Sequence, residues 1–193
     1  MDRRQFIEQL AGLAGAMPGL ALLPGLEALA HEAHARARTT TGLRSLDVDQ
    51  DAIVTRIADI LLPQTDTIGA SAVGVNRFVD LLLSESMLDT QRQRFLAGLA
   101  AIDARCRERH GAAFAASSAA LQEALVRELD QHLPAPSTNP AELAARERAP
   151  MTAETGYAQL KALTVLGYFT SAAVTRLMNV PVIPGRFDGC VHL

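Results

Sequence analysis

Residues 153–178, AETGYAQLKALTVLGYFTSAAVTRLM, are the most informative segment for the fold of this chain. Leu160, Leu163 and Leu166 follow one another at the spacing of a helix, and Phe169 continues the series. The stretch is also rather hydrophobic on every side, which is typical of a helix that is central in a bundle or covered by a partner. It therefore predicts one long helix across these residues.

Four shorter helices are predicted upstream, because apolar residues recur at helical spacing between turns and caps. Asp47 with Gln50 predicts a capping box for the first helix, and Asn76 is the predicted N-cap of the second. Gly111 closes the third helix. The fourth runs from about Ser118 to His132. The apolar faces are, in order, Ile53, Val54, Ile57, Ile60 and Leu61; Phe78, Val79, Leu81 and Leu82; Phe95, Leu99, Ile102 and Cys106; and Leu121, Leu125 and Leu129.

The remaining segments are predicted to lie on the surface. Residues 64–74 form a turn-rich loop, prolines in the stretch 134–150 leave only 141–148 for a short helix, and residues 180–193 form an extended tail. Aromatic residues make up only 4% of the chain and Trp is absent, which favours helix packing over a sheet sandwich. We predict an all-α protein, an irregular bundle of about five helices with an extended C-terminal tail.

Size and charge narrow the classes of function. The 193 residues, 49% of them hydrophobic, suit a single domain with a proper core. The formal net charge is −3, so the chain lacks the basic balance that nucleic-acid binding needs. Nucleic acid is therefore not expected as a partner.

The N-terminal residues predict a twin-arginine export signal. Arg3 and Arg4 are followed by Phe6 and then by a Gly- and Ala-containing apolar stretch at residues 10–23. That stretch is shorter than the ~20 apolar residues of a spanning helix, and Gly and Pro interrupt it. Twin-arginine export carries proteins that fold before they cross the membrane. A retained anchor is the alternative.

Ala33 and Ala35 predict where that signal is removed, because small residues flank His34 in a small-x-small cleavage pattern. The predicted division of the chain is a signal at residues 1–35 and a helical domain at residues 36–193. No cofactor motif accompanies the signal, which hints that a partner is exported with this chain.

No catalytic, cofactor-binding or metal-binding residue is predicted. The Thr65–Thr67 turn could position a ligand or a cation, but Asp and Thr in such loops most often satisfy backbone groups. Asp59 should point off the apolar face of its helix, which favours an exposed carboxylate or an interface contact over general-base chemistry. No histidine pair in the mature chain has metal-ligand spacing. Ser117 and Ser118 are more simply a helix cap than a nucleophile, and no GxGxxG follows a strand.

Two separated stretches resemble the gluconate 2-dehydrogenase subunit 3 family. The first is IADILLPQTDT at residues 57–67, leading to Gly69-Ala70 and Gly74-Val75. The second is GYFTS at residues 167–171, followed by PGRFDGC at residues 184–190. The resemblance spans the mature chain from about residue 48 to its end. The positions that depart from the family's usual residues are Ile68, Ala172 and Phe187.

The resemblance implies a heteromeric enzyme in which this chain is a small helical subunit without a catalytic group. Its partner would be a large flavoprotein of the glucose-methanol-choline type, which holds FAD and oxidises a sugar, a sugar acid or a polyol. A cytochrome c or a soluble carrier would take the electrons. The small subunit would carry the export signal for both chains, so the twin-arginine translocase is a further partner. The complex would lie in the periplasm, associated with the membrane through its partners.

A contact surface for the flavoprotein is also predicted. Aromatic residues are favoured at the buried centres of interfaces. For Thr170 and Ser171, a second interpretation is equally favoured, in which their hydroxyls bond back to the preceding helical turn instead of facing the flavoprotein. The predicted interface residues are Tyr168, Phe169, Thr170, Ser171, Arg186 and Phe187.

The two cysteines have different predicted roles. Cys106 lies on an apolar helix face, where a buried thiol acts as a small hydrophobic side chain. Cys190 lies in the predicted tail of a protein expected in an oxidising compartment, where a free exposed thiol is a liability. Our hypothesis is a disulfide from Cys190 to the large subunit, and an internal bond to Cys106 is the alternative.

Two rival functions come from other classes. One is a free-standing periplasmic protein that binds or scaffolds through the loop at residues 65–74. The other is a small hydrolase, for which the sequence offers no arrangement of nucleophile and base.

Overall fold

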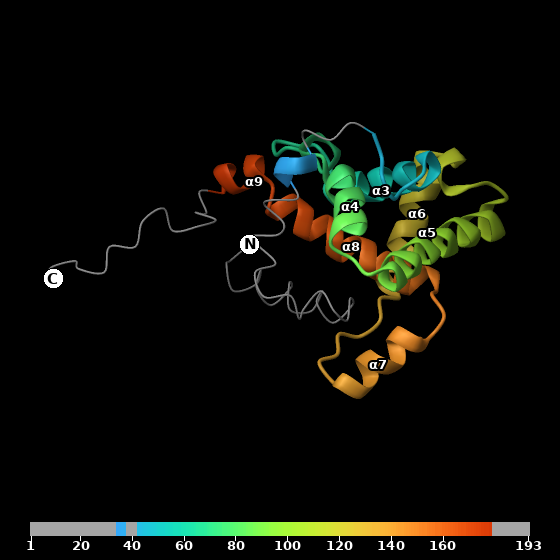
Figure 1. Cartoon of the computed structure of the whole chain (residues 1–193). Helices are drawn as coiled ribbons and strands as arrows, with labels where there is room; N and C mark the ends of the chain where they lie inside the picture. Colours follow the sequence, from blue (N-terminus) through green and yellow to red (C-terminus); the bar gives the residue numbers. More distant parts are fainter. Residues whose placement is uncertain (1–33, 38–41, 179–193) are drawn as a thin grey trace, which may run out of the picture.

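The computed structural model describes residues 34–37 and 42–178, which fold as a bundle of helices (Figure 1). No strand occurs within those ranges, so the predicted all-α class is confirmed. The extended tail predicted for residues 180–193 lies outside them. The helices are α3 (Val48–Leu61), α4 (Val75–Glu85), α5 (Asp89–His110), α6 (Ala119–Gln131), α7 (Pro140–Arg148), α8 (Ala153–Phe169) and α9 (Ala172–Leu177), with 3-10 helices η1 (Ser71–Val73) and η2 (Phe114–Ala116).

Helix α8 is the centre of the bundle, as its sequence predicts. Helices α3, α4, α5 and α6 all pack against it (Figure 1). Its side chains Tyr157, Leu160 and Leu163 are fully buried. Where α5 crosses α8, a Cβ on Gly156 would lie 2.5 Å from the carbonyl oxygen of Gly98. The two backbones can approach this closely only because neither residue has a side chain.

The long C-terminal helix is interrupted, so the prediction of one continuous helix is wrong. The break falls at Thr170 and Ser171, whose hydroxyls compete for backbone groups of the helix. Thr170 Oγ1 donates to the carbonyl of Leu166 (2.6 Å), and Ser171 Oγ donates to the carbonyl of Tyr168 (2.7 Å). Ser171 also accepts from the backbone N–H of Val174, which makes it the N-cap of α9.

The start of α3 agrees with the prediction and the start of α4 does not. Asp47 and Gln50 form the expected capping box, with the Gln50 N–H donating to Asp47 Oδ1 (2.8 Å). The N-cap of α4 is Gly74 and not Asn76, because Gly74 adopts a positive φ of 76° that turns the chain directly into the helix. Asn76 Nδ2 instead donates to Asp51 Oδ1 (2.9 Å) and ties α4 to α3.

Helix α5 buries the predicted face from Phe95 to Cys106 and ends at Gly111, where φ is 74°. Helix α6 buries Leu125 and Leu129 as predicted, but not Leu121. Leu121 is 37% exposed, and Gln122 occupies the buried position beside it. A buried amide is tolerated when its polar atoms are bonded. Gln122 Nε2 donates to the carbonyl of Phe114 (2.8 Å), and its oxygen accepts from an arginine of α3.

Helix α7 forms the predicted surface crossing, because none of its residues is buried. It projects from the body of the bundle in Figure 1. Arg94 on α5 holds it by donating to the carbonyls of Arg146 and Ala149, each at 3.0 Å. None of the helices in the described part of the chain is long and apolar enough to cross a membrane.

Candidate functional site

The first resembling stretch and residues 167–171 of the second meet at one end of the bundle, near α9 in Figure 1. The Tyr168 hydroxyl donates to the carbonyl of Ile68 (2.7 Å), which joins residues 100 positions apart in the sequence. Gly167 packs on the ring of Phe78, and a Cβ there would lie 2.6 Å from Phe78 Cδ1. We call this end of the bundle, comprising residues 64–74 and 167–171, the motif end.

Polar groups of the loop at residues 64–74 bond mainly to one another. The Thr65 hydroxyl donates to Asp66 Oδ1 (2.9 Å), and the Thr67 N–H donates to Thr65 Oγ1 (3.3 Å). The Gly69 N–H donates to Gln64 Oε1 (2.8 Å). The structural interpretation of the Thr65–Thr67 turn is therefore confirmed. The loop is a preformed surface, with residues 63–67 exposed.

Asp59 lies next to the motif end and has a structural role. It is half-buried, and its Oδ1 accepts the backbone N–H of Ser71 (3.0 Å), so it holds η1 against α3. Asp59 also lines an open groove of about 510 Å³ between α3, α6 and α8. Arg56 and Arg127 line that groove with it, so both signs of charge face the opening.

The predicted interface residues of α8 and α9 lie mostly inside this chain. Tyr168 is 7% exposed, Thr170 8% and Ser171 3%. Thr170 and Ser171 bond back to the preceding turn, as one of the two alternatives predicted. Phe169 is half-buried, and its ring packs edge-to-face on Tyr168 with centroids 5.2 Å apart.

Two large apolar side chains are exposed at the end of α9. Leu177 is 61% exposed and Met178 is 43% exposed. Contiguous exposed apolar side chains are typical of surfaces that another protein covers. Residues 63–67 of the loop region are exposed as well, so this part of the chain presents apolar, hydroxyl and carboxylate groups to solvent.

An N-terminal strap, residues 34–37 and 42–46, packs against the same end of the bundle. The His34 ring stacks on Phe78 with centroids 4.5 Å apart, and its Nε2 lies 3.2 Å from Thr170 Oγ1. His34 and Ala37 are both buried. This contact was not predicted, because His34 lies within the predicted export signal at residues 1–35.

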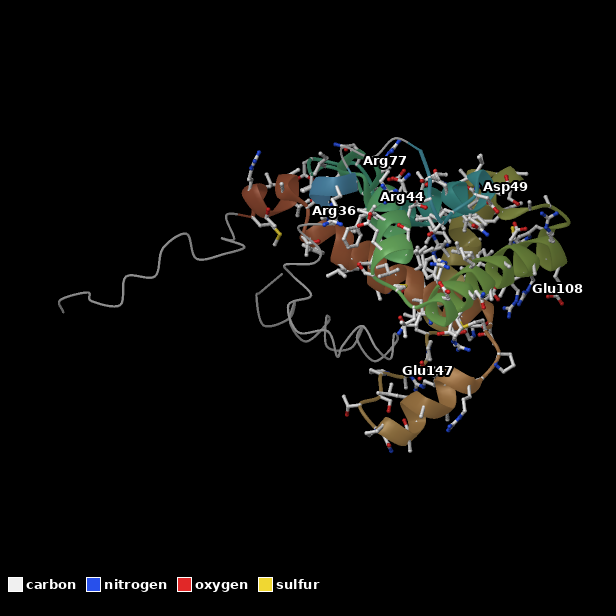
Figure 2. The ribbon with its side chains drawn as sticks, viewed as in Figure 1. Arg36, Arg44, Asp49, Arg77, Glu108 and Glu147 are labelled. Carbon is white, nitrogen blue, oxygen red and sulfur yellow. The ribbon has the colours of Figure 1, made fainter. Side chains whose placement is uncertain are left out.

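Two acidic residues of α4 hold the strap. Asp80 is 3% exposed, and its carboxylate accepts the backbone N–H groups of residues 44–46 at 2.8 to 3.2 Å. Glu85 pairs with the side chains of Arg36 and Arg44, which Figure 2 labels. The clue in the sequence was Asp80 itself, a lone carboxylate inside an apolar run.

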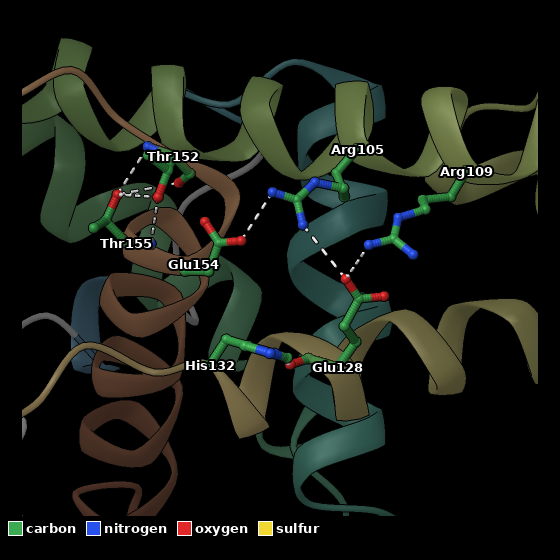
Figure 3. Close-up of polar contacts among 7 residues, drawn as sticks. All are labelled: Arg105, Arg109, Glu128, His132, Thr152, Glu154 and Thr155. Carbon is green, nitrogen blue, oxygen red and sulfur yellow. Dashed lines mark hydrogen bonds and ion pairs between the residues drawn. The ribbon is translucent and has the colours of Figure 1, made fainter.

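A network of ion pairs joins α5, α6 and α8 on another part of the bundle (Figure 3). Arg105 donates to Glu154 (2.9 Å) and lies 3.4 Å from Glu128, which also accepts from Arg109 (2.9 Å). Burial alone would raise the pKa of Glu154. Hydrogen bonds from its own backbone, Thr152 and Arg105, with the charge of Arg105, outweigh burial and lower it.

A second polar cluster links α6 to α8. The Tyr157 hydroxyl donates to Asp130 Oδ1 (2.8 Å), and Lys161 pairs with the same carboxylate. Burial and the adjacent Asp130 carboxylate raise the pKa of Tyr157 far above its ordinary value. Burial opposes ionisation of Asp130 as well, but the hydrogen bonds from Lys161 and Tyr157 lower its pKa. Both clusters cross-link the bundle.

The remaining predicted residues are placed as follows. Cys106 is a buried free thiol 3.3 Å from Ser117 Oγ, which confirms its core position. Ser118 is the N-cap of α6. Among the described residues, no group of three or more His, Cys, Asp or Glu side chains is arranged to hold a metal ion. The predicted residues that lie outside the described ranges are Arg3, Arg4, Phe6, Ala33, Arg186, Phe187 and Cys190.

Comparison with known proteins gives one family. The family model described as gluconate 2-dehydrogenase subunit 3 matches residues 48–185. The match takes in both resembling stretches as far as Gly185, and it stops before Arg186, Phe187 and Cys190. No curated protein and no solved structure gives a significant match.

Proposed function

The chain belongs to the gluconate 2-dehydrogenase subunit 3 family, and from that premise we propose that it is the non-catalytic small subunit of a periplasmic, FAD-dependent dehydrogenase. The substrate class is a sugar, a sugar acid or a polyol. FAD is held by a large subunit of the glucose-methanol-choline type, and a cytochrome c or a soluble carrier takes the electrons. The observation that carries the proposal is the family match, which covers nearly all of the described helical domain.

The motif end is the surface that we infer the large subunit covers. Its loop is already ordered by its own hydrogen bonds, so docking would cost little conformational entropy. Leu177 and Met178 offer exposed apolar area at the end of α9, and half-buried Phe169 adds an aromatic ring. Interfaces are enriched in Met and aromatic side chains at their centres.

The same chain would export its partner. Arg3, Arg4 and Phe6 form the predicted twin-arginine signal, and that route accepts folded proteins. A small subunit that binds only the folded flavoprotein would stabilise it by mass action and then carry it across the membrane. Cys190 would link the two subunits after export, in an oxidising compartment.

The loop geometry weighs against the rival binding protein. A ligand at residues 65–74 would need free polar groups, whereas Thr65, Asp66 and Thr67 already bond to one another. We therefore assign the loop to protein contact.

Affinity purification tests the proposal. The chain is tagged after Leu193, expressed from its native locus, and examined by an absorbance scan and mass spectrometry. We expect a co-purifying large flavoprotein with the bands of oxidised flavin. A colourless protein that purifies alone would contradict the proposal.

A surface variant locates the contact. We expect Leu177→Asp combined with Met178→Asp to lose the flavoprotein, because charges in a buried interface go unpaired, while the melting temperature of the chain stays the same. Val48→Asp is the matched control, because Val48 is 79% exposed. Its neighbour Asp49 lies across the bundle from α9 in Figure 2. Equal recovery of flavoprotein with both variants would move the contact away from α9.

A further inference from the structure

The first four described residues are helical and buried at both ends. His34 is 8% exposed and Ala37 is 6% exposed, whereas Ala35 and Arg36 between them face solvent. The peptide bond between Ala35 and Arg36 therefore lies inside a turn that is anchored on either side.

His34 is the anchor on the N-terminal side. Thr170 Oγ1 donates its proton to the carbonyl of Leu166, so it must accept from His34, which requires a proton on His34 Nε2. The imidazole also covers one side of the Phe78 ring, and Gly167 lies against that ring without a Cβ between them. Removing His34 would expose Phe78 and leave Thr170 without its donor.

The C-terminal side of the strap is anchored as firmly. Asp80 accepts the backbone N–H groups of residues 44–46, and Glu85 pairs with Arg36 and Arg44. Charge-assisted hydrogen bonds to a buried carboxylate are among the stronger polar contacts in proteins. The strap thus has contacts at residues 34, 36 and 44–46 along α4 and the end of α8.

We propose that His34 is a structural part of the folded domain, and that the cut releasing the export signal falls before His34 and not after Ala35. A protease needs a segment that can unfold locally into an extended chain. The side chains of Ala35 and Arg36 face solvent, but the bond between them cannot open in this way while both flanking contacts hold. The position of the cut rests on the proposed export function. The anchoring of the strap does not.

Limited trypsin digestion of the full chain tests the anchor without any need for export. Trypsin can cut after Arg36, and the early cleavage rate tracks the population of the open strap. We expect His34→Ala to raise the rate of cutting between Arg36 and Ala37 about tenfold. Thr170→Val, which removes the hydroxyl that His34 contacts, should raise it less. Ala35→Ser alters the exposed neighbour of His34 and is the matched control, with an unchanged rate.

The melting temperature of each variant is recorded alongside, so that local opening is distinguished from loss of the whole fold. Equal cleavage rates in the wild-type chain and in His34→Ala would overturn the anchor.

The intact mass of the chain recovered from the periplasm tests the cut. A mature chain that begins at or before His34 supports the proposal, and one that begins at Arg36 overturns it. A chain that stays uncut in the cytoplasm would refute the export function, and the anchor would then stand or fall on the digestion result.

Discussion

Replacing Gly156 by Ala should destabilise the bundle, although Ala is the better helix former. A Cβ at this position would lie 2.5 Å from the carbonyl oxygen, 2.6 Å from the Cα and 2.7 Å from the carbonyl carbon of Gly98. All three are backbone atoms, so no side chain can rotate away and α5 must move off α8. Overpacking of this kind costs roughly 1–3 kcal/mol, and rigid backbone neighbours place it at the upper end.

The helix propensity of Ala returns about 1 kcal/mol, which leaves a net loss of about 2 kcal/mol in the free energy of unfolding. For a chain of this size that lowers the melting temperature by roughly 4–8 °C. Thermal unfolding followed by circular dichroism measures it. Gly98→Ala should behave alike, because its Cβ would lie 2.7 Å from the Cα of Gly156.

The double variant is the sharper test. Once the helices have separated to accept one methyl group, the second methyl group costs less. We therefore expect the double variant to lose about 1 kcal/mol less than the sum of the losses in the two single variants. Ala100→Gly, on the exposed side of α5, calibrates helix propensity alone and should lose about 1 kcal/mol. A Gly156→Ala chain as stable as the wild type, or more stable, would refute the close crossing.

Polar contacts elsewhere in the bundle give three more predictions. Tyr168→Phe removes the donor to the Ile68 carbonyl and should cost about 1 kcal/mol in urea unfolding, with faster amide exchange in the loop; unchanged exchange would contradict the link between the two stretches. Asp80→Asn weakens a buried acceptor of several backbone N–H groups and should lower the free energy of unfolding by about 2 kcal/mol. A loss of no more than ~0.5 kcal/mol, as for an ordinary surface substitution, would contradict the anchoring role of Asp80. Because the folded chain lowers the pKa of Glu154 and Asp130, they stabilise it above the ordinary carboxyl pKa. That contribution should fade as pH drops below about 4, and a flat pH–stability profile there would count against it.

Local sequence patterns are enough to predict most of the helices and the face that most of them bury. Apolar spacing predicts the core of α5 from Phe95 to Cys106, the capping box at Asp47 predicts the start of α3, and Gly111 predicts the end of α5. These features depend on neighbours within a turn or two of helix, so local physical chemistry is enough to predict them. The all-round hydrophobicity of residues 153–169 likewise predicts a central helix.

Features that depend on partners far away in the sequence become visible only once the chain is folded. Gln122 displaces Leu121 from the buried face of α6 because a carbonyl on η2 and an arginine on α3 satisfy its amide. Sequence patterns within α6 contain neither partner. The break in the last helix involves both local and distant contacts. Thr170 and Ser171 bond to the preceding turn, and Thr170 also accepts a hydrogen bond from His34, 136 residues away.

At the motif end, too, the sequence predicts part of the arrangement and the folded structure supplies the rest. The two resembling stretches are recognisable in the chain, but their meeting through Tyr168 and Ile68 requires α8 to run beside the loop that follows α3. His34 is the clearest case. Its neighbours in sequence predict an export signal, whereas its neighbours in space, Phe78 and Thr170, make it part of the domain. A side chain's role is set by what surrounds it after folding, and for contacts this distant in the chain only the packed structure supplies those surroundings.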